Sequence, residues 1–562
     1  MRIKVHFFCI LIIVILVSVC TSVYSQTFDW ARKAGTNIIA TGASIATDDH
    51  SNSYVTGSFF GKAEFGEDIE LNAAVRDIYL VKYDSHGKAL WARKAGGNAD
   101  DFGNAVALDK EGNCYLAGSF ASNAQFGKDT LFSKGQHDMF IAKYSSKGEL
   151  LWSRSGGGYY DDHAMAVTID RAGNAYVAGY YKDTMWFSNG PLILGRRISL
   201  FNMFLAKYDS KGNLIWAKPI AGSNYQTQNE GLAIVADAKG MVYLTGYFQG
   251  EAMFDKINLT NHGTSALFIA KYDGMGKNIW VKSAGADGST VAGKGIAVND
   301  AGDLYVTGSY TNTCLFDTIR LVSKSLGYPE LFLAKYNTAG DITWLRSTSS
   351  FGAKTTYATS LDAEENPYVV GSFRDTATFG DETLSGMGTE NMFVAKYDPN
   401  GSIQWAKQVG RHGMVIGRSV SIDKAGNLYI VGNFSDTADF GKSRIIANES
   451  TQDMFFTKII PYAASKEHKL KDSPSTEFQF LSCYYDRRSS AATIRFSIPR
   501  SMFVTLGVYG IMGVLAESFI EGQRQSGVYE VKIDLKNFLS DEYYCRLQAG
   551  DDKITKKIVI QK

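Results

Sequence analysis

Three segments of this 562-residue chain bring acidic and amide side chains together in short runs. The runs are Asp100-Asp101-Phe102-Gly103, Asp161-Asp162-His163 and Gln228-Asn229-Glu230. Carboxylate and amide oxygens are the ligands that Ca²⁺ prefers, and the ion takes about six to eight of them. The candidate binding residues are therefore Asp101, Asp162 and Glu230, and the candidate cofactor is calcium. The alternative is that the runs are solvated acidic loops that bind nothing.

No other part of the sequence carries a motif for catalysis. It contains no Gly-x-Ser-x-Gly, no His-Glu-x-x-His, no phosphate-binding glycine loop and no paired-cysteine metal motif. The two acids of a glycosidase or lyase can lie far apart in a sequence, so a secreted glycan-acting enzyme stays open as an alternative. The sequence favours a binding protein without a catalytic site, and a structural surface-layer component is the third alternative.

These residues lie in an internal repeat, and the repeat is revealed by three residue patterns that recur at regular intervals, which we call ladders. Tryptophans recur at Trp30, Trp91, Trp152, Trp216, Trp280, Trp344 and Trp405. A Tyr-x-x-Gly pattern begins at Tyr54, Tyr115, Tyr176, Tyr243, Tyr305, Tyr368 and Tyr429. An apolar-x-Lys-Tyr pattern has its lysines at Lys82, Lys143, Lys207, Lys271, Lys335 and Lys396, with a degenerate copy at Lys458. All three ladders indicate seven copies of a unit of roughly 61 residues.

Each copy contains four strand-like runs, named a, b, c and d. In the second copy they are Ala105–Leu108, Cys114–Phe120, Met139–Tyr144 and Leu150–Ser155. Asp or Asn followed by Gly marks the a-to-b and c-to-d turns, which predicts an antiparallel meander. Apolar runs such as Phe140-Ile141-Ala142 need cover on both faces, and stacking the sheets around an axis supplies it. The expected fold is all-β, a seven-bladed β-propeller whose d-to-a loops gather the acidic runs near blades two to four.

The ends of the repeat predict how the ring closes. The seventh copy has a, b and c runs but no d run, whereas an unpaired d-like run around Trp30 precedes the first copy. Pairing the Trp30 strand with the c strand near Phe455 completes blade seven and removes two exposed sheet edges. The expected propeller therefore covers residues 26–460.

The repeat resembles that of the SBBP-type β-propeller proteins, whose signature is Asp-x-x-Gly-Asn-x-Tyr-Val-Thr-Gly. Residues 170–179 read Asp-Arg-Ala-Gly-Asn-Ala-Tyr-Val-Ala-Gly and carry the resemblance. It covers about residues 27–460, and it implies the fold without implying catalytic residues.

The first 25 residues have the layout of a secretory signal peptide: a basic start with Arg2 and Lys4, an apolar run and a polar end. Cleavage is expected between Ser25 and Gln26. A transmembrane anchor is the alternative, but the apolar run, about 13 residues long, is shorter than the roughly 20 that a helix needs to cross a bilayer. A lipoprotein site at Cys20 is a poorer alternative, because Val19 precedes it where a small residue is expected.

Net charge and hydropathy exclude some classes of partner. Loss of Arg2 and Lys4 with the signal peptide reduces the basic residues from 58 to 56, against 57 acidic residues. A nearly neutral chain without a clustered basic surface does not predict a nucleic-acid partner. No later segment is apolar enough to form a transmembrane helix, so the mature chain is expected to be secreted or held at the outer cell surface. Its partner there is an unidentified surface ligand, a glycan or a protein.

The carboxy-terminal part departs from the repeat. Residues 461–475 are expected to be a charged linker, and residues 476–562 return to short alternating strands that predict a small immunoglobulin-like β-sandwich. These residues look like the type A sorting domain of the type IX secretion system of Bacteroidota. The resemblance is carried by the runs Thr493–Pro499, Val508-Tyr509 with Gly513, Gly527–Val531, Tyr543–Gly550 and Lys556–Ile560.

The resemblance implies a cleavable export address, with the type IX machinery as its partner. Gly510 and the pair Asp541-Glu542 depart from the sorting-domain pattern at turn or edge positions. The alternative is an ordinary immunoglobulin-like module that the mature protein keeps.

Four cysteines remain after removal of the signal peptide. Cys483 and Cys545 lie in the first and a late strand of the expected sandwich, so a disulfide between them is expected. Cys114 and Cys314 belong to blades two and five and are expected to stay unpaired.

Overall fold

The computed structural model describes most of the chain beyond the expected signal peptide. The described residues are 26–36, 38–66, 68–188, 192–194, 201–222, 228–325, 327–349, 352–410, 412–441, 443–447, 452–461, 468–470, 477–486, 491–510, 515–535, 542–550 and 552–559. The expected signal peptide with Ser25, and most of the expected linker 461–475, lie outside them. Every regular element described is a β-strand, which confirms the all-β class, and no described helix is long and apolar enough to span a membrane.

The chain separates into two compact bodies, and Phe28–Ile460 forms the larger one. It consists of groups of strands that we call repeats one to seven. Repeat one is β2 (Ile39–Thr47), β3 (Ser53–Glu64), β4 (Glu70–Tyr83) and β5 (Ala89–Gly97). Repeat two is β6 (Phe102–Leu108), β7 (Cys114–Phe126), β8 (Asp129–Tyr144) and β9 (Leu150–Gly157). In both repeats, consecutive strands pair antiparallel in a meander.

Repeats three to six keep this meander and add a separate short hairpin between the second and third strands. Repeat three is β10 (Asp162–Ile169), β11 (Ala175–Tyr181), β12 (Thr184–Phe187), β13 (Leu192–Leu194), β14 (Asn202–Tyr208) and β15 (Leu214–Gly222). Repeat four is β16 (Glu230–Ala236), β17 (Val242–Phe248), β18 (Glu251–Phe254), β19 (Ile257–Thr260), β20 (Ala266–Tyr272) and β21 (Asn278–Gly285). Repeat five is β22 (Val291–Val298), β23 (Leu304–Tyr310), β24 (Thr313–Phe316), β25 (Ile319–Val322), β26 (Glu330–Tyr336) and β27 (Ile342–Ser347). Repeat six is β28 (Lys354–Leu361), β29 (Pro367–Phe373), β30 (Thr376–Phe379), β31 (Glu382–Ser385), β32 (Asn391–Tyr397) and β33 (Ile403–Val409).

Repeat seven combines the end of the larger body with the start of the described chain. It is β34 (Val415–Ile422), β35 (Leu428–Phe434), β36 (Thr437–Phe440), β37 (Ser443–Ile446), β38 (Asp453–Pro461) and β1 (Gln26–Thr36). β1 lies between β38 and β3 in the sheet order, and the Thr457 hydroxyl donates a 2.7 Å hydrogen bond to the Trp30 carbonyl. The indole of Trp30 covers Gly87, which has a φ of 76° and belongs to the turn between β4 and β5. β1 therefore contacts both repeat seven and repeat one.

Strand pairing links five of the repeats to the one before each of them. In repeats three, four and five the first strand of the short hairpin pairs with the fourth strand of the preceding repeat: β12 with β9, β18 with β15 and β24 with β21. In repeats one and two the far end of the second strand does the same, so β3 pairs with β1 and β7 with β5. Backbone hydrogen bonds thus join these neighbouring repeats in addition to the packing of their side chains.

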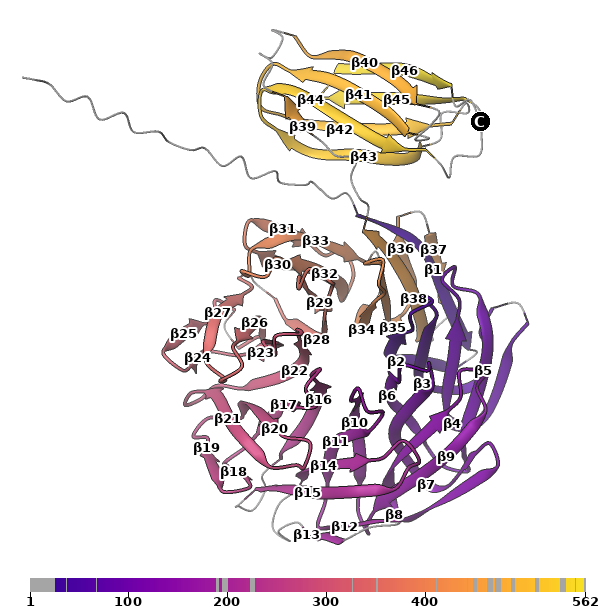
Figure 1. The fold of residues 1–562 in the computed structure, drawn as a ribbon, viewed down its shortest axis with the longest axis vertical. Coiled ribbons are helices and arrows are strands. Elements are labelled where there is room, and N and C mark those ends of the chain that lie inside the picture. The colour runs from indigo at the N-terminus through magenta and orange to yellow at the C-terminus, as the bar shows by residue number, and fades with distance from the viewer. Residues whose placement is uncertain are drawn as a thin grey trace, which may run out of the picture. The chain divides into compact units, whose positions relative to one another are not determined.

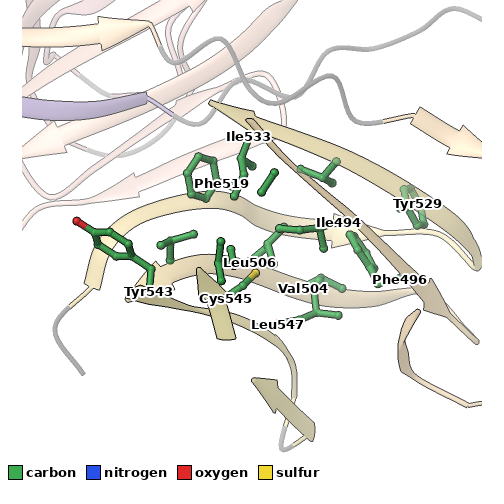
Figure 2. Close-up of a cluster of buried hydrophobic side chains, with 14 of the residues drawn as sticks. Ile494, Phe496, Val504, Leu506, Phe519, Tyr529, Ile533, Tyr543, Cys545 and Leu547 are labelled. Carbon is green, nitrogen blue, oxygen red and sulfur yellow. The ribbon is translucent and has the colours of Figure 1, made fainter. Parts of the chain in front are cut away.

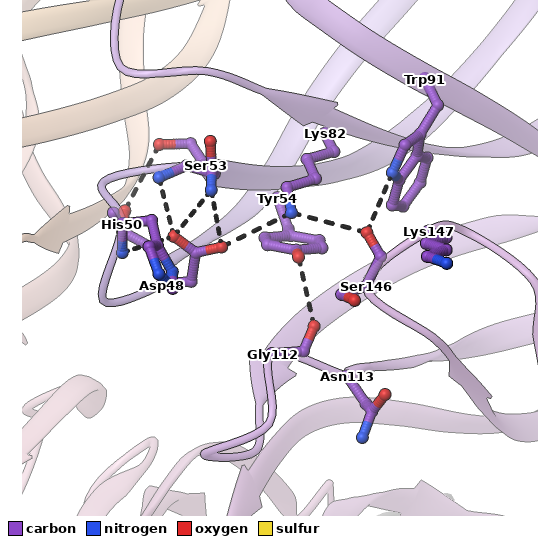
Figure 3. A network of polar contacts seen from close by, with 12 residues as sticks. Asp48, His50, Ser53, Tyr54, Lys82, Trp91, Gly112, Asn113, Ser146 and Lys147 are labelled. Carbon is purple, nitrogen blue, oxygen red and sulfur yellow. Dashed lines mark hydrogen bonds and ion pairs between the residues drawn. The ribbon is translucent and has the colours of Figure 1, made fainter.

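The ladder residues form a polar network at several junctions between repeats, and Figure 3 shows the one around Lys82. The Lys82 ammonium lies 3.6 Å from the Asp48 carboxylate, 4.8 Å from the centre of the Tyr54 ring and 3.5 Å from the Ser146 carbonyl. Trp91 donates its indole N–H to the same carbonyl at 3.2 Å. Because Ser146 belongs to repeat two, the ladders hold adjacent repeats together.

The second compact body includes the chain after Pro461. One of its four-stranded antiparallel sheets has the order β39 (His468–Leu470), β44 (Gly527–Asp534), β41 (Ala491–Ile498) and β40 (Gln479–Asp486). The other has the order β43 (Leu515–Arg524), β42 (Met502–Tyr509), β45 (Glu542–Ala549) and β46 (Asp552–Val559). Alternate side chains of both sheets meet in a single core (Figure 2), among them Ile494, Phe496, Leu506 and Leu547.

The two cysteines of this body contact the same core. Cys545 is buried in it and Cys483 packs against it, and both thiols are free in the structure. Burial raises the pKa of the Cys483 thiol to about 11. The disulfide between them stays a prediction. Cys114 and Cys314 are buried in different repeats and are also free.

Candidate functional site

The first strand of each repeat contains a β-bulge at the same place. Its pairing with the second strand skips one residue, as between Gly293 and Gly295 in β22 and between Gly417 and Ser419 in β34. A bulge leaves one residue outside the ladder and redirects its side chain. The seven skipped residues are Ala43, Asn104, Met165, Leu232, Lys294, Tyr357 and Arg418.

These seven residues line one cavity of about 510 Å³, to which all seven first strands contribute. Figure 1 shows those strands, β2, β6, β10, β16, β22, β28 and β34, arranged around a central axis. We call the space the axial cavity. The backbone is equivalent at all seven positions, whereas the side chains differ. The side chains of the bulge residues therefore determine which chemical groups line the cavity.

Consecutive repeats five, six and seven supply the charged side of the axial cavity. The Lys294 ammonium lies 5.3 Å from the centre of the Tyr357 ring, and the Arg418 guanidinium carbon lies 4.3 Å from it. Both distances are typical of cation–π contacts. The tyrosine thus holds two cations over one ring.

The two cations lack an acidic partner. Neither Lys294 nor Arg418 makes a hydrogen bond or an ion pair with any described residue, and no Asp or Glu is among the described residues that line the axial cavity. Burial lowers the pKa of Lys294, and the charge of Arg418 lowers it further. Burial raises the pKa of Tyr357, and so does the charge of Glu390, which accepts a 2.6 Å hydrogen bond from the Ser372 hydroxyl. Half-buried cations without a counter-charge favour binding of an anion.

The expected acidic residues Asp101 and Asp162 lie elsewhere, and both are fully buried. The Asp101 carboxylate accepts hydrogen bonds from the backbone N–H groups of Gly97 and Ala121, at 3.0 and 3.1 Å. Asp162 starts β10 and accepts from Gly158 and Lys182, at 2.6 and 3.2 Å. Burial raises the pKa of Asp101 to about 7 and that of Asp162 to about 8. Each carboxylate thus fastens the turn before its own repeat.

Glu230, the third expected residue, is the first residue of β16 and is half-buried. Its side chain bonds to Tyr247, its partner across the β16–β17 pair, and burial raises its pKa. The position equivalent to Asp101 is instead Asn229, which is fully buried and accepts a 3.1 Å hydrogen bond from the backbone N–H of Gln249. Asp101, Asp162 and Glu230 therefore bond to different sets of residues and share no partner among those described, and a shared calcium site stays a prediction.

A second group of polar side chains surrounds His163, next to Asp162. His163 stacks on Tyr180, with ring centres 4.9 Å apart, and lies 5.3 Å from the ring of His137. His137 is 2.9 Å from the Asp161 carboxylate. Burial lowers the pKa of His163 to about 4, and His137 adds to the effect.

The acidic residues that depart from the repeat in its loops predicted a different site, and the axial cavity was not predicted. Lys294, Tyr357 and Arg418 stand inside strands, in the triplets Gly-Lys-Gly, Thr-Tyr-Ala and Gly-Arg-Ser. The bulge residue stands eleven positions before each ladder tyrosine, between two small residues, and this spacing is the sequence signal that marks the bulge. When the seven first strands are aligned on that signal, the bulge residue varies in size and charge, whereas the residues on either side of it stay small.

Two curated proteins resemble the chain over most of its length. An uncharacterised WD repeat-containing protein of Acanthamoeba polyphaga mimivirus is 23% identical over 537 residues, covering 78% of this chain and 38% of that protein. The regulatory protein FlaEY of Caulobacter vibrioides is 25% identical over 401 residues, covering 66% of this chain and 40% of that protein. The chain thus spans less than half the length of either relative.

Two solved structures from Bacteroides species also align with the chain. A protein of unknown function from Bacteroides caccae is 11% identical, with 63% of this chain and 93% of that one covered and a TM-score of 0.29. A DUF4221 family member from Bacteroides vulgatus is 10% identical, with 78% and 99% covered and a TM-score of 0.31.

The SBBP family, described as a beta-propeller repeat, matches residues 404–433. The match covers β33, β34 and most of β35, which are the fourth strand of one repeat and the first two strands of the next. This confirms the expected resemblance for these residues. The family shown for residues 404–433 is therefore the SBBP beta-propeller repeat.

Proposed function

We propose that this chain is a binding protein whose axial cavity receives an anionic group of its ligand, such as a carboxylate, phosphate or sulfate. The observation that carries the proposal is the pair Lys294 and Arg418, which face one tyrosine in a cavity whose described lining contains no acid. Arginine presents a planar fork of donors that suits such groups, and lysine adds a mobile point charge. The rest of the lining, including Asn104 and Met165, is neutral and can contact the uncharged part of the ligand.

We infer that the scaffold of this site is a seven-bladed propeller, with repeats one to seven as its blades. Contacts between the first and last repeats support closure of the ring. Asn433 accepts a 2.7 Å hydrogen bond from the Gly42 N–H, and the Lys424 ammonium lies 2.6 Å from the Asp49 carboxylate. Lys458 reaches the Ser85 carbonyl at 3.3 Å, as Lys82 reaches Ser146. A closed ring fixes the seven bulge residues around one axis.

We further propose that the protein acts outside the cell. The support is the signal-peptide layout of residues 1–25 and the resemblance of residues 476–562 to a type A sorting domain. In this proposal a Bacteroidota type IX machinery recognises the second body as an immunoglobulin-like export address. The larger body then acts as a secreted or surface-bound receptor for a glycan or protein ligand.

Titration with simple anions tests the site. Isothermal titration calorimetry of the purified protein with inorganic phosphate and with D-glucuronate should detect binding that weakens as NaCl is added. Lys294→Met and Arg418→Met keep much of each side chain's apolar length and remove its charge. Each should weaken binding about tenfold or more, because a charge-assisted hydrogen bond is lost.

Two variants serve as controls. Lys110→Met removes a lysine that is 79% exposed at the turn between β6 and β7, and Met165→Leu changes a neutral residue of the same cavity. Both should bind anions like the parent protein. Binding that is equally weak in Lys110→Met and Lys294→Met, or absent from the parent for both anions, would refute an axial anion site.

A further inference from the structure

Three metal-ligating side chains converge where repeat two meets repeat three, away from the axial cavity. They are His137 in β8, Asp161 in the turn before β10, and His163 in β10. One ligand atom from each lies within 4.8 Å of the others, and all three residues are half-buried. Among the described residues this is the one group of three or more His, Cys, Asp or Glu side chains with that geometry.

The contacts of His137 leave one nitrogen without a partner. Its Nδ1 lies 2.9 Å from the Asp161 carboxylate, and its backbone N–H donates to the same oxygen at 3.4 Å. Its Nε2 is buried and has no hydrogen-bond partner among the described residues. The two ring nitrogens point to opposite sides of the imidazole, so Nδ1 is the one that can share an ion with the Asp161 carboxylate.

Aromatic rings hold both imidazoles in place. His163 stacks on Tyr180 at an interplanar angle of 30°, and Phe102 lies 5.8 Å from His137. Rings that pack against other rings lose less freedom when they bind a ligand. Packing therefore holds both imidazoles near each other, and a small closure brings their nitrogens to metal-ligand distances.

The preceding junction provides an internal comparison, because the equivalent positions one repeat earlier are Arg76, Asp100 and Phe102. There the backbone N–H of Arg76 donates to the Asp100 carboxylate at 3.3 Å, as His137 does to Asp161. The Arg76 guanidinium carbon lies 5.3 Å from the centre of the Phe102 ring. The same backbone therefore carries a cation and a ring at one junction and two imidazoles at the next.

We propose that His137, Asp161 and His163 form a binding site for a divalent transition-metal ion, of which Zn²⁺ is the simplest example. Two imidazole nitrogens and one carboxylate oxygen suit zinc, nickel or copper better than calcium, which prefers oxygen. Three protein ligands leave a fourth position for water or for a group of a bound ligand. Ligands of tetrahedral zinc are about 3.3 Å apart, so the three side chains close by up to about 1.5 Å on binding.

Metal binding by the full-length, tag-free protein tests the site. Equilibrium dialysis against Zn²⁺ should recover about one bound equivalent per chain, and Co²⁺ should give the visible absorption of a low-coordinate site. His137→Arg and His163→Phe each install the residue that the preceding junction carries, so both variants should keep the parent's melting temperature without metal. Each should weaken Zn²⁺ binding about 100-fold, and Asp161→Asn about tenfold or more.

The control is His86→Ala, which removes an exposed histidine from the turn between β4 and β5 and should bind Zn²⁺ like the parent. Lys294→Met should also bind Zn²⁺ normally, which separates this site from the axial cavity. Undiminished Zn²⁺ binding by His163→Phe, no binding by the parent, or an equal loss in His86→Ala would overturn the proposal.

Discussion

The buried carboxyl group of Asp101 accepts hydrogen bonds from the backbone around it. It accepts two backbone hydrogen bonds, and repeat four uses Asn229 in the same place to accept the equivalent bond from the residue 20 positions later. An amide can therefore do part of this work without a charge. The contacts of Asp101 favour a loop-holding role, and direct ligand binding by Asp101 or Asp162 stays a prediction.

The raised pKa of Asp101 makes stability depend on pH. Its folded pKa of about 7 exceeds the ordinary value of 3.8, so the folded protein binds a proton that the unfolded chain releases. The stability from this group is fully present below about pH 4 and is lost as the pH rises to about 7. We expect Asp101→Asn to melt at least about 2 °C above the parent at pH 8 and close to it at pH 4.5.

Thermal melts over this pH range, with Asp287→Asn as the exposed control, measure the effect. The control should follow the parent at every pH. If the melting temperature of Asp101→Asn is instead lower than that of the parent at pH 8, the ionised carboxylate stabilises the turn and the expected sign is wrong.

At the scale of elements, β1 has two neighbours that come from opposite ends of the larger body. Removing residues 26–36 leaves the edges of β38 and β3 unpaired, and exposed strand edges promote association between chains. We expect the deletion variant to form soluble aggregates and to melt at lower temperature than the parent, by size-exclusion chromatography with light scattering and by differential scanning fluorimetry.

A permuted chain is the matched control. Residues 26–36 placed after Ile460, through a turn like Asp84-Ser85-His86-Gly87, restore the strand without its original position. This variant should stay monomeric and melt close to the parent. A monomeric deletion variant with the parent's melting temperature would contradict the role assigned to β1.

The four-stranded repeats could be predicted from the sequence because the periodic ladder residues lie in the second, third and fourth strands. The short hairpins were not predicted, since each strand is about four residues long and its turn uses a different residue, such as Asp255 with a φ of 52° or Gly380 with a φ of 60°. The bulges were missed for another reason. They shift the register by one residue inside strands too short for alternation to show it.

At the scale of the whole molecule, the residues that recur in the repeats form the scaffold, and the residues that differ between repeats form the site. Ladder residues such as Lys82 and Trp91 recur because similar contacts hold several of the junctions. Lys294, Tyr357 and Arg418 do not recur, and their joint position depends on strands more than 60 residues apart. Sequence reasoning can find such residues singly, but their convergence follows only from the arrangement of the repeats.

The two compact bodies have separate cores, so we expect them to unfold independently. Calorimetry of the full chain should show two transitions. A chain ending at residue 461 should keep one of them, together with the anion affinity of the parent. Loss of the remaining transition in this truncated chain would show that the larger body needs the second body to fold.

The position of β1 also has a consequence in time. As the chain emerges from a ribosome or a secretion pore, the strand that arrives first finds its partner β38 only after more than 400 further residues have followed. Loop closure over that distance is slow, and folding rates fall as contacts become more distant in sequence. The larger body is therefore expected to remain an open row of repeats until synthesis or export is nearly complete, and its last folding step joins its two ends.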